Sequence, residues 1–343
     1  MDEQTMLAQL ATDLFGDHTA PESATSIEDH ARLIWRHMEA AGLTGIGVAE
    51  ELGGSGGSII EAAEVIIAAG RAAAPVPVAD AVFTAGWLTG QLEHPLGIGI
   101  TLAWSSRDVA AHRAGDRIVL RGRLRHVPWA RLASQLLLVL PEEGIVVVLP
   151  RTAARVEHGL SIAEEPSDTL HLDDVELPAS SVIPVAAAPA LARELRHRIA
   201  LSRALLLAGA LQTVTELTIS YVKEREQFGR PIARFQAVGQ SVAILAGHST
   251  LATAAARAAV RDPENPTAVL SARVATAAAA SRGAMLAHQL HGAIGFTREH
   301  RLHELTRRLW AWRDEVGTEG EWRQELGLHT ISQAGSVWET LTG

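Results

Sequence analysis

The chain of 343 residues carries 39 acidic and 30 basic side chains, a net charge of -9, and no cysteine. Its length predicts two or three compact units, and the lack of a Lys/Arg-rich block argues against a nucleic-acid or anionic-membrane surface. Without cysteine there is no disulfide, thiolate metal site or cysteine nucleophile. We expect a cytoplasmic protein without signal peptide or membrane span, because the N-terminal residues are acidic and no apolar stretch reaches about 20 residues.

The first part of the chain, residues 1–94, is predicted to form a helical domain. Apolar side chains recur at intervals of three and four along residues 28–42, which predicts a helix with one apolar face made by Ala31, Ile34, Trp35 and Met38. Gly42 is the expected C-cap of this helix. A glycine-rich break at 53–58 precedes a second helical stretch.

Ser55 lies in this break, within a sequence, GGSGG, that fits the nucleophile elbow of hydrolases. Such an elbow requires a strand before the serine and a helix after it. A helical pattern follows, but the preceding GIGVAEEL ends in two acids and makes a poor strand. A flexible loop is the preferred interpretation, and a hydrolase built on Ser55 is a remote alternative.

The middle of the chain, residues 95–188, is predicted to be a small antiparallel β domain. Short runs rich in leucine and β-branched residues alternate with turn residues, at 117–122, 134–140, 145–150 and 169–178. The sequence PEEG at 141–144 indicates a hairpin between two of these runs.

The last part, residues 189–343, is predicted to be a four-helix bundle. One apolar stripe at helical spacing consists of Leu201, Ala204, Leu205, Ala208 and Leu211. Another consists of Leu302, Leu305, Leu309, Trp312 and Val316. The predicted fold class is therefore α+β, in the order helical domain, β domain, helical bundle.

Residues 221–240, YVKEREQFGRPIARFQAVGQ, join two predicted helices by a turn that suits a phosphate. Gly229 permits the chain to reverse, and Pro231 is expected at the first position of the next helix. A turn of this kind exposes helix-end amides beside Arg225 and Arg230. An ordinary helix–helix turn with solvated arginines explains the same residues equally well.

Two further short patterns lie near the end of the bundle. QLHGAIGFT at 289–297 ends a helix with two glycines, which favours either close approach of a ligand or a tight loop. His300 and His303 could share a helix face, but zinc requires three or four ligands. A solvated charged face is the preferred interpretation, and no metal site is predicted.

These motifs, in this order and at this separation, resemble the acyl-CoA dehydrogenase family. YVKEREQFGRPIARFQ is similar to the family's arginine–Phe-Gly segment, QLHGAIGFT to its Q-x-x-G-G-x-G segment, and GVAEELGGSGGS to its N-terminal Pro-Glu-x-x-Gly-Gly loop. The resemblance covers essentially the whole chain. It implies a dimeric or tetrameric FAD enzyme that oxidises an acyl-CoA to the trans-2-enoyl-CoA and passes electrons to an electron-transferring flavoprotein.

The resemblance also implies which residues contact FAD. In the family a neighbouring subunit holds much of the adenine and pyrophosphate half of the cofactor. The matching residues here are Arg225, Gln227, Phe228, Gln236, Gln289, Gly292, Gly295 and, at the family's Gly-Thr, Thr318. The flavin half differs, because 101–116 lacks the family's Thr-Glu-Pro and Gly-Ser-Asp sequences and 126–128 replaces its Trp-Ile-Thr, with Trp129 as a stand-in.

The family's reaction requires a carboxylate that removes the α-proton of the acyl group. The position directly before Gly-Thr, where the family usually has glutamate, is Val316 here, and the position that some relatives use instead is Ile199. Glu315 lies about 100° round the helix from Val316 and faces inward only if the helix kinks. The acid nearest to Ile199 is Glu194, about a turn and a half away.

This pattern leads to the hypothesis of one subunit of a heteromeric acyl-CoA dehydrogenase. The chain would contribute adenine-side residues to an FAD whose flavin and base lie on a different subunit. Family members of this kind are associated with bacterial degradation of bulky CoA esters such as steroid side chains. The alternatives are a homomeric enzyme that uses Glu315 as its base and a flavin-free, non-catalytic binding or scaffold protein.

Overall fold

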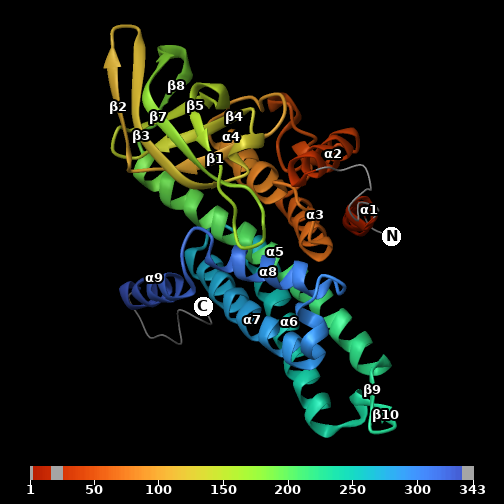
Figure 1. The fold of residues 1–343 in the computed structure, drawn as a ribbon. Helices are drawn as coiled ribbons and strands as arrows, with labels where there is room; N and C mark the ends of the chain where they lie inside the picture. Colours follow the sequence, from red (N-terminus) through yellow and green to blue (C-terminus); the bar gives the residue numbers. More distant parts are fainter. Residues whose placement is uncertain (1–2, 17–25, 334–343) are drawn as a thin grey trace. The chain divides into compact units, whose positions relative to one another are not determined.

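The computed structural model describes residues 3–16 and 26–333 and divides the chain into two compact units (Figure 1). The first unit consists of Met1–Val65 and Ala74–Ser202, and the second of Ile66–Ala73 and Arg203–Gly343. Two helices, α3 (Ile59–Ala72) and α5 (Ala188–Glu224), contribute residues to both units. The division into three domains remains a prediction from the sequence.

The N-terminal helices of the first unit are α1 (Glu3–Gly16) and α2 (Ile27–Ala40). Ser26 caps α2 by accepting a hydrogen bond from the amide of Asp29. Gly42 adopts a left-handed φ of 71° just beyond the helix, as expected of a glycine that ends one. The predicted apolar face is confirmed, because Ala31, Ile34, Trp35 and Met38 are all buried.

The glycine-rich loop of the first unit lies between short 3₁₀ turns and α3. The turns span Leu43–Gly45 and Glu50–Leu52. Because a 3₁₀ turn rather than a strand precedes Ser55, the loop lacks the strand that a nucleophile elbow requires. After α3 the chain continues as a buried π-helix, Ala79–Ala85, and then as α4, Gly86–Gln91.

Two four-stranded sheets complete the first unit. One has the order β1-β4-β5-β8, from Thr101–Ser105, Gln135–Leu140, Ile145–Pro150 and Val182–Pro184. The other has the order β2-β3-β7-β6, from Val109–Ala114, Arg117–Pro128, Ser167–Pro178 and Arg155–Glu157. Figure 1 shows β2 and β3 as a long hairpin at the edge of the second sheet.

The strands confirm the β content predicted for the middle of the chain. PEEG joins β4 to β5, with Leu140 paired to Ile145. The prediction of a wholly antiparallel domain is wrong in one place, because β1 and β4 pair in parallel. A parallel pair requires a long connection, and here β2 and β3, in the other sheet, provide it.

The second unit is arranged around α7, Pro266–His291. This helix packs against α6 (Gln236–Arg261), α8 (Leu302–Asp314) and α9 (Glu319–Ser332). The stripe predicted on α5 is buried, as are Leu302, Leu305, Leu309 and Trp312 of α8. The α+β class and the C-terminal helical bundle are therefore confirmed, with α9 as an additional helix.

Glycines allow the closest helix approaches in the second unit. A Cβ atom at Gly209 of α5 would lie 2.2 Å from the carbonyl oxygen of Ile67 in α3. A Cβ atom at Gly70 of α3 would lie 2.4 Å from the carbonyl oxygen of Leu206. The two helices therefore touch backbone to backbone, which only glycine permits at these positions.

The long helix α5 is apolar enough to cross a membrane by length and composition, with a mean hydropathy of 1.3 over its most apolar window. The sequence analysis did not anticipate a stretch of this kind. In the structure 61% of that window is buried inside the protein. Burial of this extent is typical of a core helix, whose apolar side chains pack against other parts of the same chain.

Candidate cofactor and base site

The predicted phosphate-binding turn is a two-residue β-hairpin. β9 (Glu226–Gln227) pairs with β10 (Arg230–Pro231), and the turn residues Phe228 and Gly229 both have positive φ, 53° and 75°. This is the backbone of a type I′ turn, which glycine favours. The prediction that Pro231 starts a helix is wrong, because this residue belongs to β10 and α6 begins only at Gln236.

Side chains of this hairpin are presented to solvent. Phe228 is 90% exposed, and the side chains of Arg225, Gln227 and Gln236 are exposed as well. Within the described part of the chain, none of those three polar side chains makes a hydrogen bond or ion pair. Their hydrogen-bonding groups are therefore available to a phosphate, a base or another subunit.

The two glycines after α7 have different structural roles. Gly292 ends the helix with a φ of 64°, and nothing lies within 4 Å of the place where a Cβ atom would be. Gly295 is buried, and a Cβ atom there would lie 2.9 Å from the Cβ atom of His291. Of the two predicted explanations, open space for a ligand fits Gly292 and tight packing fits Gly295.

A hollow of about 380 Å³ lies next to these glycines in the second unit. It is lined by Ser281, Met285, His288, Gln289, Phe296 and Trp310. The His288 ring is stacked on the rings of Phe296 and Trp310, at centroid distances of 4.2 and 5.7 Å. The exposed amide of Gln289 thus stands beside a wall of flat rings, which suits a planar ligand such as adenine.

Two buried histidines support this wall. His288 donates or accepts a hydrogen bond at Thr306 Oγ1, 2.9 Å away, and His291 stacks on Tyr221 at 4.4 Å. Burial lowers the pKa of His288. Burial also lowers the pKa of His291, together with the charges of His300 and His288 and against the hydrogen bond to the Ala287 carbonyl, which raises it. Both rings are therefore neutral in the folded protein at neutral pH.

The base region begins where α8 ends, at Asp314. The prediction that the helix continues through Val316 is wrong, because Glu315 is already extended and Val316 has a left-handed φ of 61°. That conformation is rare for a β-branched residue. Val316 is therefore off the stripe that it was expected to continue.

Glu315 lies at this helix end with its carboxylate partly buried. Its Oε2 accepts a hydrogen bond from Nε of Arg203 of α5 at 2.5 Å. The side chain of Arg203 is 1% exposed and that of Glu315 is 18% exposed. The kink that the sequence required for Glu315 to face inward is thus present, but the acid that it turns inward is paired with an arginine.

A second buried arginine holds the backbone of the same segment. Arg273 of α7 is fully buried, and its Nη2 donates to the carbonyl oxygens of Trp312 at 3.2 Å and Arg313 at 2.5 Å. It also lies 3.4 Å from the carbonyl oxygen of Glu315. A cation at the carboxyl end of a helix is favourable, since the last carbonyls lack partners within the helix.

Arg203 and Arg273 were not predicted as part of the site, although both leave a signal in the sequence. Arg203 interrupts the apolar run LSRALLLAGAL, and Arg273 interrupts the alanine-rich run SARVATAAAA. A charged residue within an apolar helical stretch is buried only when it is paired. Each therefore pointed to an acceptor inside the bundle.

Thr318, the expected Gly-Thr contact to the cofactor, caps α9. Its hydroxyl accepts from the amide of Glu321 at 3.3 Å and donates to the carboxylate of the same residue at 3.0 Å. The amide of Thr318 also donates to that carboxylate, at 2.6 Å. This reciprocal pair is a capping box, so the polar groups of Thr318 are already engaged within the chain.

The alternative base position is apolar and buried as well. Ile199 is 4% exposed within α5, and Glu194, the nearest acid, is exposed. The segment after Pro128 is also closed off, because Trp129 is 5% exposed and its amide donates to the carbonyl oxygen of Pro166. The stand-in tryptophan is therefore packed inside the first unit.

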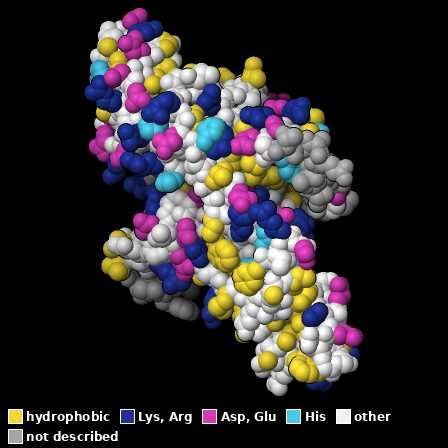
Figure 2. All heavy atoms as spheres, viewed as in Figure 1, with side chains coloured by type: hydrophobic (Ala, Val, Ile, Leu, Met, Phe, Trp, Pro, Cys, Tyr) yellow, Lys and Arg dark blue, Asp and Glu magenta, His cyan; other side chains and the backbone are white. Residues whose placement is uncertain are grey.

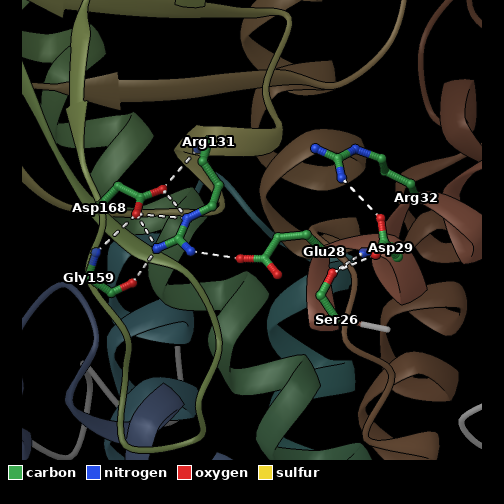
Figure 3. A network of polar contacts seen from close by, with 7 residues as sticks. All are labelled: Ser26, Glu28, Asp29, Arg32, Arg131, Gly159 and Asp168. Atoms are coloured by element: carbon green, nitrogen blue, oxygen red, sulfur yellow. Dashed lines mark hydrogen bonds and ion pairs between the residues drawn. The ribbon is translucent and has the colours of Figure 1, made fainter. Parts of the chain in front are cut away.

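An ion-pair network fixes the segment that follows Trp129 (Figure 3). Arg131 donates through Nε and Nη2 to the fully buried carboxylate of Asp168, through Nη1 to Glu28, and through Nη2 to the carbonyl oxygen of Gly159. The hydrogen bond to Asp168 raises the pKa of Arg131. Burial acts to raise the pKa of Glu28, but hydrogen bonds from its own amide and from Arg131 outweigh burial and lower it.

The histidine pair considered as a metal site has local hydrogen bonds instead. His300 Nδ1 accepts from the amide of Leu302 at 3.1 Å, and His303 Nδ1 contacts the carbonyl oxygen of His300 at 2.8 Å. Both residues thus stabilise the start of α8. Among the residues that the structure describes, no three His, Asp or Glu side chains are grouped as metal ligands would be.

Comparison with known proteins identifies relatives of both halves of the chain. The family "Acyl-CoA dehydrogenase, N-terminal domain" matches residues 1–91, and "Acyl-CoA dehydrogenase, C-terminal domain" matches residues 193–319. Acyl-CoA dehydrogenase IpdE2 of Mycobacterium tuberculosis (strain ATCC 25618 / H37Rv) is 28% identical over 322 residues, which cover 88% of this chain and 89% of that protein.

Solved structures share the fold over almost the whole chain. A subunit of the ChsE4-ChsE5 complex from Mycobacterium tuberculosis superposes with a TM-score of 0.85 at 23% identity, covering 98% of this chain and 99% of that one. A variant of the Tcur3481-Tcur3483 steroid ACAD superposes with a TM-score of 0.84 at 24% identity, covering 97% and 99%. At these identities the likeness concerns the fold.

Proposed function

Because the chain belongs to the acyl-CoA dehydrogenase family, we propose that it is one subunit of a heteromeric acyl-CoA dehydrogenase that contributes to an FAD site and supplies no base. The substrate of the assembly is an acyl-CoA, and the partner is a second acyl-CoA dehydrogenase chain. The chemistry that FAD would supply when bound is acceptance of the β-hydride of the acyl group. The acceptor of its electrons is an electron-transferring flavoprotein, and the assembly works in the cytoplasm.

The observation that carries this proposal is the contrast between two groups of residues. The adenine-side residues Arg225, Gln227, Gln236 and Gln289 are exposed, and within the described chain their side chains have no polar partner. The residues expected next to the reaction are engaged, Glu315 by Arg203 and Thr318 by Glu321. These adenine-side residues thus offer polar groups to a cofactor held partly elsewhere, whereas Glu315 and Thr318 are engaged within the described chain.

The exposed surface of the bundle favours the proposal of a partner subunit. Large apolar side chains are exposed there, including Phe228, Ile244, Leu251, Met285 and Phe296. Figure 2 shows hydrophobic side chains exposed over the lower, helical part of the molecule. Exposed apolar area of this kind is typical of a surface that another protein covers.

The names of two fold relatives support the heteromer and its substrate class. One is the ChsE4-ChsE5 complex, and the other is the Tcur3481-Tcur3483 steroid ACAD. Both names join two chains, and the second names steroids. We therefore propose a heterotetramer that acts on a steroid-derived CoA ester.

Two other functions make different demands on the same residues. A homomeric enzyme would need Glu315 as its base, and Arg203 opposes that role. A flavin-free scaffold would leave Arg225, Gln289 and the hollow beside Gln289 without a ligand. The heteromer accounts for both the engaged and the available residues.

Visible absorbance of bound flavin tests the proposal. The chain is purified alone and after co-expression with an acyl-CoA dehydrogenase encoded beside it. We expect a colourless lone chain and a yellow, stable complex. In the complex, Arg225→Ala and Gln289→Ala should reduce the flavin content, while Glu315→Gln should leave turnover unchanged. Stoichiometric flavin and acyl-CoA turnover in the lone chain would contradict the proposal, and a flavin-free complex would favour the scaffold.

A further inference from the structure

The contact between Arg203 and Glu315 bears on the acid–base chemistry of this chain. We propose that Arg203 is a positioning residue that keeps the carboxylate of Glu315 from accepting the α-proton of an acyl-CoA. Glu315 thus lies close to the position where the family's base is expected but does not remove the proton. This inference rests on the proposed function, because it concerns the same proton removal.

Electrostatic attraction between Arg203 and Glu315 opposes protonation of the carboxylate. The guanidinium of Arg203 is almost completely removed from water, and its Nε lies 2.5 Å from Oε2 of Glu315. Water and salt screen a buried pair much less than a surface pair. A proton that bound to Glu315 would neutralise the carboxylate and deprive a buried cation of this anion, which is costly. Glu315 is therefore held as an anion and accepts a proton poorly.

The geometry of the segment also restrains Glu315. Arg203 holds the side chain of Glu315, while Arg273 hydrogen-bonds the carbonyl oxygens of Trp312 and Arg313 just before it. Side chain and backbone are thus fixed by two different helices, α5 and α7. To reach a substrate, the carboxylate would have to leave one arginine while the other still holds its backbone.

Arg203 also lies near the alternative base position on α5. It follows Ile199, the alternative base position, by four residues, so the two side chains lie on one face of the same helix. A cation therefore stands one turn from a position where some relatives carry the basic carboxylate.

Deuterium exchange at the α-carbon tests the inference without flavin. In this exchange the C–H bond breaks, the carboxylate takes the proton, the bonding electron pair forms the enolate, and the enolate takes a deuteron from D₂O. The full chain is incubated with cyclohexylacetyl-CoA in D₂O, and loss of the α-proton signal is followed by NMR. Wild type and Glu315→Gln should exchange at the same background rate.

Arg203→Met should then raise exchange at least tenfold, because a positioned general base typically contributes about 10²–10⁴-fold. The double variant Arg203→Met/Glu315→Gln should return to background, which assigns the gain to Glu315. Arg203→Lys, which restores a cation, should also stay at background. Arg273→Met removes the hydrogen bonds to the carbonyl oxygens of Trp312 and Arg313 and shows whether a looser backbone alone raises exchange.

Three results would overturn the inference. Exchange by wild type that Glu315→Gln abolishes would mean that Glu315 is a base with Arg203 in place, and this comparison needs no arginine variant to fold. No gain in a folded Arg203→Met, or an equal gain in the double variant, would show that Arg203 does not restrain Glu315. The heteromer could still hold in these cases, because its own test reads flavin content and complex formation.

Discussion

Replacing Arg131 by methionine tests how far the first unit depends on the network in Figure 3. The substitution keeps the aliphatic stem and removes the guanidinium, whose side chain is 10% exposed. Among the described residues, Asp168, which is 0% exposed, then keeps the amides of Arg131 and Gly159 as hydrogen-bond donors. A buried carboxylate without its cation costs about 3–5 kcal/mol.

A loss of this size should be visible as a lower unfolding midpoint. One kcal/mol corresponds to roughly 2–4 °C for a unit of this size, so we expect a decrease of about 6–20 °C. Thermal unfolding followed by circular dichroism measures it. Arg121→Met is the matched control, because it breaks an exposed arginine–aspartate pair on the same sheet and should leave the midpoint unchanged.

The double variant Arg131→Met/Asp168→Leu shows whether Arg131→Met loses stability because Asp168 is left as a buried charge without its cation or because packing is lost. Replacing a buried ion pair by apolar residues of similar size is often neutral or stabilising. We expect it to recover most of the stability that Arg131→Met loses. A single variant that loses less than about 1 kcal/mol would refute the reasoning, since Asp168 would then tolerate burial without its arginine.

Three further predictions concern the second unit. Gly209→Ala should destabilise the protein by about 1–3 kcal/mol in urea titrations, because its Cβ atom would collide with the Ile67 carbonyl oxygen; Gly247→Ala, where nothing lies within 4 Å, is the control. Thr318→Ala should cost about 1 kcal/mol through loss of the α9 cap and leave the flavin content of the complex unchanged; reduced flavin would show that the hydroxyl contacts the cofactor. Burial lowers the folded-state pKa of His288 and His291, so their contribution to stability is complete above the unfolded-state pKa of about 6.5 and is lost as the pH falls below it. The urea midpoint of the wild type should therefore fall between pH 7.5 and 5, and that of His288→Phe should fall less. An equal fall of the two midpoints would contradict the assignment.

Periodic elements could be predicted from the sequence because local patterns determine them. The face of α2 and the stripe of α5 repeat at helical spacing, and both are buried. The hairpin of β4 and β5 follows from two apolar runs and the turn PEEG. The parallel pairing of β1 with β4 was missed, because pairing direction depends on where the chain returns after β2 and β3 and not on either strand.

Motifs in the sequence identified residues of the candidate site, but they did not show whether the polar groups of these residues are already hydrogen-bonded within the chain. Spacing identified Gln289 and Thr318 equally well, and both are exposed, yet the side chain of Thr318 closes a capping box. The difference lies in Glu321, three residues after Thr318, which completes the capping-box pattern in the sequence. A motif thus indicates where a residue is, and the partners around it decide whether its polar groups remain available.

The end of α8 shows why the position of a base cannot be counted along a helix. Continuing the stripe from Leu302 assigns the inward position to Val316, and this would hold if the helix ran on. Arg273, about 40 residues earlier in the chain, binds the carbonyl oxygens of Trp312 and Arg313, and the next residues leave helical geometry. Glu315, one residue earlier, therefore takes the inward position, and its carboxylate accepts a hydrogen bond from Arg203. The buried arginines therefore decide both which residue faces the bundle and whether that residue can act as a base.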